Sequence, residues 1–147
     1  MSDPARARRA VLDTNVLLDL WLFDDPSVRA LRAAIEAGAV QALRSPDCDA
    51  EFADVLGRAQ FGLDPPTRAR LLAAWSACSE EIAPAAPAPL ACSDPDDQKF
   101  LDAAFATGAE LLITRDKALL QLARRAEAAG VRIRRPAEAI TYDRLRP

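Results

Sequence analysis

Short runs of apolar residues alternate along this chain with longer segments in which apolar positions recur every three or four residues. Residues 10–12 and 111–114 are apolar at nearly every position, which is typical of strands buried on both faces, and residues 40–44 form a third strand candidate. Because such strands are separated by helical segments, the pattern predicts an α/β fold with a mostly parallel sheet between layers of helices.

Helices are expected where apolar stripes are framed by capping residues. Ile82 is a candidate for a short strand, and Val131 and Ile133 alternate with arginines as in an edge strand. The expected helical segments, with Asp, Ser or Pro at several starts and Gly at several ends, are 16–23, 25–37, 46–57, 64–75, 94–107 and 117–129.

The segment 16–23 is apolar almost all round, so it is either buried in the core or covered by a partner. In the second case Trp21 and Phe23 would contact another copy of the chain or another protein. We favour burial in the core for this segment.

The length of 147 residues suits one domain with a sizeable core, which we assign to residues 9–140 between flexible tails at 1–8 and 141–147. No apolar stretch approaches the ~20 residues of a membrane span. The N-terminus lacks the apolar core of a signal peptide, and three cysteines without zinc-type spacing indicate reduced thiols. We therefore expect a cytoplasmic protein without a membrane partner.

Histidine is absent from the sequence. Its absence excludes Ser-His-Asp and Cys-His catalysis, histidine general bases and most zinc sites. Any catalysis must then use carboxylates, lysine, hydroxyls, a thiol or a bound ion.

Four acidic residues are expected near one edge of the sheet. Asp13 and Asp116 directly follow the two most apolar strands, and the carboxyl ends of parallel strands form the edge where open sheets bind ligands. Asp97 lies in the first turn of the helix before the second strand, and Glu51 lies on an earlier helix. Carboxylates brought together repel one another, and a hard divalent ion such as Mg²⁺ or Mn²⁺ relieves that repulsion.

Each of these acids also has a purely structural interpretation. Asp13 and Asp116 can cap the helices that follow them, Asp97 can complement a helix dipole, and Glu51 can be exposed.

Other polar residues lie beside the four acids in the sequence. Asn15 and Thr114 can orient carboxylates, or merely cap and satisfy the backbone. Four further acids are candidates for supporting the first four from outside, although solvent exposure is the favoured interpretation for each: Asp19, Asp94, Asp96 and Asp102.

Positive charge is concentrated in the C-terminal part of the chain. Residues 111–147 contain nine basic residues and four acidic ones, although the whole chain has a net charge of −3. An acidic centre with basic ends suits a metal site beside a surface for a polyanion. Solvated helix faces and a tail give the same counts, and charge alone favours that simpler interpretation.

Four stretches resemble the acidic motifs of the PIN-domain family, in the family's order and spacing, and the resemblance extends over residues 9–140. The stretch 11–19 resembles the opening of the domain, and 51–58 resembles its glutamate-bearing helix. The stretches 94–104 and 111–117 resemble its third and fourth acidic motifs.

The resemblance implies a three-layer α/β/α sandwich with a parallel sheet. It also implies a catalytic, metal-binding quartet, supported by Asn15 and made of Asp13, Glu51, Asp97 and Asp116. The family's usual activity is a ribonuclease that depends on one or two Mg²⁺ or Mn²⁺ ions. Many small bacterial members are VapC-like toxins, so an antitoxin and a second copy of the chain are candidate partners besides RNA.

Basic residues near the fourth motif and in the following strand would steer the RNA backbone. They are Arg115, Lys117, Arg132, Arg134 and Arg135. Because Tyr142 is the lone aromatic residue of the basic segment, no platform for base stacking is evident from the sequence.

Two other functions compete with this interpretation. A phosphatase of the haloacid-dehalogenase type also has an aspartate after its first strand, but it typically has a second aspartate at the position of Asn15, and its lysine has no obvious counterpart here. A PIN-like module could instead bind RNA or a protein without cutting, because a fold does not fix a function.

Overall fold

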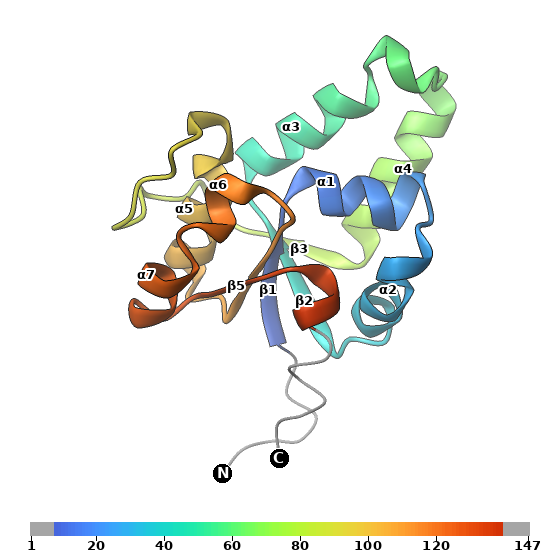
Figure 1. The fold of residues 1–147 in the computed structure, drawn as a ribbon. Coiled ribbons are helices and arrows are strands. Elements are labelled where there is room, and N and C mark those ends of the chain that lie inside the picture. Colours follow the sequence, from blue (N-terminus) through green and yellow to red (C-terminus); the bar gives the residue numbers. More distant parts are fainter. Residues whose placement is uncertain (1–7, 140–147) are drawn as a thin grey trace.

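A computed structural model describes residues 8–139, and it contains a sheet of five parallel strands in the order β3-β2-β1-β4-β5 (Figure 1). The expected parallel α/β fold is confirmed. The predicted tails lie outside the described residues, except that Arg8 belongs to the first strand. The strands are β1 (Arg8–Leu12), β2 (Val40–Arg44), β3 (Ser79–Glu81), β4 (Leu111–Ile113) and β5 (Arg132–Arg134).

Helices connect the strands and cover both faces of the sheet, so the three-layer arrangement is confirmed as well (Figure 1). The α-helices are α1 (Thr14–Leu17), α2 (Arg29–Glu36), α3 (Pro46–Leu56), α4 (Pro65–Ala77), α5 (Gln98–Thr107), α6 (Lys117–Leu120) and α7 (Ala123–Ala128). Short turns of other helix types are η1 (Leu18–Leu22), η2 (Pro26–Val28), η3 (Ala59–Phe61) and η4 (Pro95–Asp97).

Several expected elements differ in detail from the structure. The helix expected at 16–23 is α1 followed by the π-helical turn η1, and the helix expected at 25–37 begins with the 3₁₀ turn η2 before α2. The helix expected at 117–129 is two helices, because a turn separates α6 from α7. The helix expected at 94–107 begins with the 3₁₀ turn η4 before α5. Ile82 follows β3 rather than belonging to it, although its N–H still donates to the carbonyl of Arg44 at 2.9 Å.

Side chains of the central strands alternate between two hydrophobic cores, as the pleat of a strand requires. Ala10 and Leu12 of β1 face the core that contains residues of η1, α2, α3 and α4. Val11 faces the opposite core, which is built largely from α5, α6 and α7. Burial on both faces explains why these strands are apolar at successive positions.

The pairing of β1 with β4 sets the position of the residues that follow both strands. Leu12 lies opposite Ile113, and the N–H of Asp13 donates to the carbonyl of Ile113 at 3.1 Å. The chain segments that carry Asp13 and Asp116 therefore leave the sheet side by side at its carboxyl edge.

The apolar segment after β1 is largely buried in the core, as favoured from the sequence. Trp21 is 8% exposed and packs on Trp75 of α4, with the two ring centroids 6.4 Å apart. The guanidinium of Arg32 lies 4.3 Å from the centroid of the Trp21 ring. Phe23 is the exception, since it is 55% exposed and meets Phe61 at a centroid distance of 6.0 Å. No helix within residues 8–139 has the length and apolar character needed to cross a membrane.

Replacing Trp21 by Ala tests whether this segment belongs to the core. We expect the free energy of unfolding in urea to fall by about 3–5 kcal/mol, because a large buried ring is lost and a cavity remains. Phe23→Ala, the matched exposed aromatic, should cost about 1 kcal/mol or less. A Trp21→Ala protein of undiminished stability would show that the core assignment of this segment is wrong.

Candidate metal centre

Asp13 is held rigidly at the end of β1. Its Oδ1 accepts a hydrogen bond from the N–H of Val16 at 3.0 Å, which caps α1, and its Oδ2 accepts one from the hydroxyl of Thr114. The side chain is buried, and burial raises the pKa of Asp13 more than these hydrogen bonds lower it, with repulsion from Asp116 also raising it. Asp13 therefore caps a helix, as its structural interpretation expects, and also lies close enough to Asp116 and Asp97 for electrostatic repulsion.

Asp116 follows β4 at the same edge of the sheet. Its Oδ1 accepts from the N–H of Ala118 at 2.7 Å and caps α6, and its own N–H donates to Thr114 Oγ1 at 2.9 Å. The hydroxyl of Thr114 thus donates to Asp13 and accepts from the backbone of Asp116. This single buried threonine fixes the two acidic segments relative to each other.

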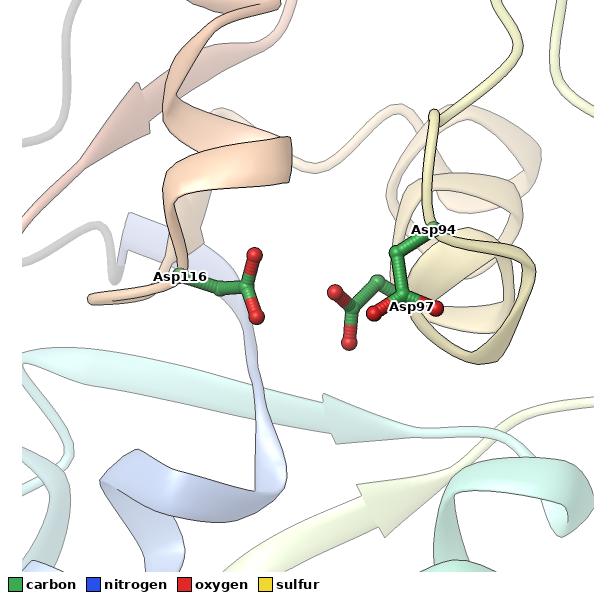
Figure 2. A group of neighbouring side chains, drawn as sticks. All are labelled: Asp94, Asp97 and Asp116. Carbon is green, nitrogen blue, oxygen red and sulfur yellow. The ribbon is translucent and has the colours of Figure 1, made fainter.

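Asp97 and Asp94 complete a group of three carboxylates with Asp116. One oxygen from each of the three lies within 4.8 Å of the others, and Figure 2 shows the side chains of Asp97 and Asp116 pointing toward one another from separate segments. The Oδ2 of Asp97 is buried without a hydrogen-bond partner among the described residues. Desolvation raises the pKa of Asp97 to about 7, and the neighbouring carboxylates of Asp116, Asp94 and Asp13 add to that rise.

Glu51 lies in the same cleft but outside this group of three. Its Oε1 accepts from the Nζ of Lys99 at 2.7 Å, and its Oε2 accepts from the hydroxyl of Thr14. The group of three therefore contains two members of the expected quartet, Asp97 and Asp116, together with Asp94, for which the sequence favoured simple exposure, and Asp13 and Glu51 lie outside it.

A cleft of about 270 Å³ is lined by four of these acids, Asp13, Glu51, Asp94 and Asp97. Exposed Asn15 also lines this cleft. Its lining further includes residues that sequence reasoning missed, from the segment that runs from the end of α3 through the turn η3: Arg58, Gln60 and Phe61. Phe61 adds an aromatic side chain to a cleft that the acids also line, and the sequence did not reveal it because Phe61 is distant in the chain from Asp13 and Asp97.

The basic residues expected to steer RNA lie in different places. Arg115 is bound to Asp19, and its Nη2 donates to Ser27 at 2.8 Å. Lys117 and Arg135 are exposed. Arg132 and Arg134 approach Glu127 at 3.5 and 3.0 Å, and Arg132 also lines a second cleft beside Arg8 and Glu110, at the amino edge of the sheet.

The donor set at the carboxyl edge fits a divalent cation. Its potential ligand atoms are carboxylate oxygens, which Mg²⁺ and Mn²⁺ prefer, and Asp97 also carries the buried Oδ2, which has no hydrogen-bond partner within residues 8–139. Repulsion from neighbouring carboxylates contributes to the raised pKa of Asp97, and a cation bound there would offset that repulsion.

A parallel α/β/α sandwich with acids gathered at its carboxyl edge defines a class of α/β proteins whose ligand site lies beyond the strand ends. The PIN domain family matches residues 9–118, and the chain belongs to that family. PIN domains are generally metal-dependent nucleases, so the haloacid-dehalogenase alternative is set aside. A comparison with curated proteins found no match.

The raised pKa of Asp97 predicts how the stability of the metal-free protein depends on pH. Because folding raises this pKa from its ordinary 3.8 to about 7, the folded state retains a proton that the unfolded state releases, and the resulting stability is lost as the pH rises through 7. We expect the Tm of wild type in EDTA to fall by a few degrees between pH 5 and pH 8, and the Tm of Asp97→Asn to fall less.

Asp47→Asn, which removes an exposed carboxylate from the first turn of α3, is the matched control for this comparison. It should retain the wild-type dependence of Tm on pH. An Asp97→Asn protein whose Tm falls as steeply as that of wild type would contradict the raised pKa.

Proposed function

We propose that this protein is a Mg²⁺- or Mn²⁺-dependent endoribonuclease whose catalytic centre is the acidic cleft at the carboxyl edge of the sheet. The observation that carries the proposal is the buried Oδ2 of Asp97, which no group of the described chain partners, in a residue grouped with Asp94 and Asp116. Such an arrangement is costly unless a cation binds it. The PIN domain match supports the nuclease chemistry.

Asp94, Asp97 and Asp116 would hold the ion, and Asp13 lies close enough to raise the pKa of Asp97 by repulsion. When bound, the ion supplies activation of water and neutralises charge on the phosphate. The chain contributes fixed geometry, since Thr114 and the N–H of Val16 orient the Asp13 carboxylate before any ligand arrives. In-line attack by water, with departure of the 3′-oxygen, leaves a 5′-phosphate on the product.

The biological setting is proposed from the family resemblance. We propose that the protein is the VapC-like toxin of a toxin–antitoxin pair and acts on RNA in the cytoplasm. Its proposed protein partners are an antitoxin and a second copy of the same chain. One observation favours a second candidate, a PIN module that binds RNA or protein without cutting it. Glu51 is paired with Lys99, which leaves one of the four expected acids engaged by the chain itself.

A cleavage assay on labelled RNA with added Mn²⁺ tests the catalytic proposal. Wild type should cut and leave 5′-phosphate ends. Asp13→Asn and Asp116→Asn should lose more than the roughly 10- to 100-fold that removal of an outer partner costs at a metal site. Asp47→Asn should cut like wild type. Binding of Mn²⁺ without cleavage of several RNAs would favour the non-cutting module.

The positions of the basic residues predict unequal effects on RNA binding. Lys117 starts α6 directly after Asp116, whereas Arg132 lies toward the amino edge of the sheet. In an Asp13→Asn background that prevents cleavage, Lys117→Ala should weaken RNA binding and reduce the slope of log affinity against log salt by about 1. Arg132→Ala should change both quantities much less.

Filter binding at several salt concentrations measures both quantities. Equal losses for the two variants would place the RNA on a path that also crosses the amino edge of the sheet. That result would contradict the proposed position of the substrate.

A further inference from the structure

Lys99 places a positive charge against Glu51, one of the acids that line the cleft. It lies in the first turn of α5, two residues after Asp97, and its Nζ donates to Glu51 Oε1 at 2.7 Å and to the backbone carbonyl of Asp96 at 2.7 Å. The side chains of Lys99 and Glu51 are each 23% exposed, so the pair is largely withdrawn from solvent. An ion pair in this environment is screened less than a surface pair.

The contact is fixed from several directions. Glu51 projects from α3 and Lys99 from α5, so the pair joins two helices that are far apart in the sequence. The second carboxylate oxygen of Glu51 accepts from the hydroxyl of Thr14, which follows Asp13. Both oxygens of Glu51 are thus engaged by groups of the chain.

The two sides of the cleft therefore differ in charge balance. On the Glu51 side, the ammonium of Lys99 already supplies a cation. On the other side, Asp94, Asp97 and Asp116 lie together, and Asp97 Oδ2 has no partner among the described residues. A divalent ion gains most where the negative charge is uncompensated.

We propose that Lys99 is a positioning residue that acts as a built-in cation for Glu51, so that the centre takes one divalent ion, on the side of Asp94, Asp97 and Asp116. Lys99 stands where a second ion would otherwise be drawn to Glu51. This inference rests on the proposed function, since it concerns the metal stoichiometry of the same cleft.

Mn²⁺ binding tests the inference without reference to activity. Isothermal calorimetry and paramagnetic resonance of bound Mn²⁺ would be compared for wild type, Lys99→Met, Lys99→Arg and the double variant Lys99→Met/Glu51→Gln. Wild type should bind one ion. Lys99→Met should bind a second ion, because Glu51 loses its ammonium partner. Lys99→Arg, which keeps a cation beside Glu51, and the double variant, which removes the Glu51 carboxylate, should each bind one ion.

Thermal unfolding of the metal-free variants is the control for folding. Lys99→Met should lower Tm because Glu51 is left partly buried and unpaired, and adding Glu51→Gln should restore much of the loss. With the single variant Glu51→Gln as the fourth protein, this double-mutant cycle reports the ion pair itself, and absence of coupling would overturn the inference.

The remaining outcomes separate the inference from the function on which it rests. Two ions in wild type, or one ion in a folded Lys99→Met protein, would overturn the role of Lys99 and leave the metal-dependent nuclease standing. Absence of Mn²⁺ binding by wild type would overturn both.

Discussion

Electrostatic repulsion between carboxylates at the carboxyl edge of the sheet is the constraint on which the rest of the site depends. The pairing of β1 with β4 brings the segments of Asp13 and Asp116 together, and η4 adds Asp94 and Asp97. The strongly apolar strands fix the segments of Asp13 and Asp116, so these two acids cannot move apart without disturbing the core. The fold thus maintains a negative charge that a bound cation would stabilise.

Two threonines orient the acids on the two sides of the cleft. Thr114 donates its hydroxyl to Asp13, and Thr14 donates its hydroxyl to Glu51. Each hydroxyl fixes one carboxylate oxygen and leaves the other to a different partner, which for Glu51 is Lys99. The same type of side chain therefore supports one acid that faces an uncompensated cluster and another that is already neutralised.

The sequence was sufficient to predict what local pattern determines. Continuous apolar runs predicted β1 and β4, and the positions of Asp13 and Asp116 at one edge follow from that. The exposure of Phe23 was not predicted, because the π-helical turn η1 alters the direction in which the next side chain points. The N–H of Phe23 donates to the carbonyl of Leu18, five residues back, at 2.8 Å. The Lys99–Glu51 pair spans 48 residues, and spacing along the chain carries no signal for such a contact.

Calorimetry of Mn²⁺ binding to wild type at pH 6 and pH 8 tests the central claim most directly. If the acidic group binds the ion, the proton held by Asp97, whose pKa is about 7, must leave first. Binding should then be roughly tenfold weaker at pH 6 than at pH 8, since a ligand must be deprotonated before it coordinates. Absence of binding, or an affinity independent of pH, would contradict a metal centre built on Asp97.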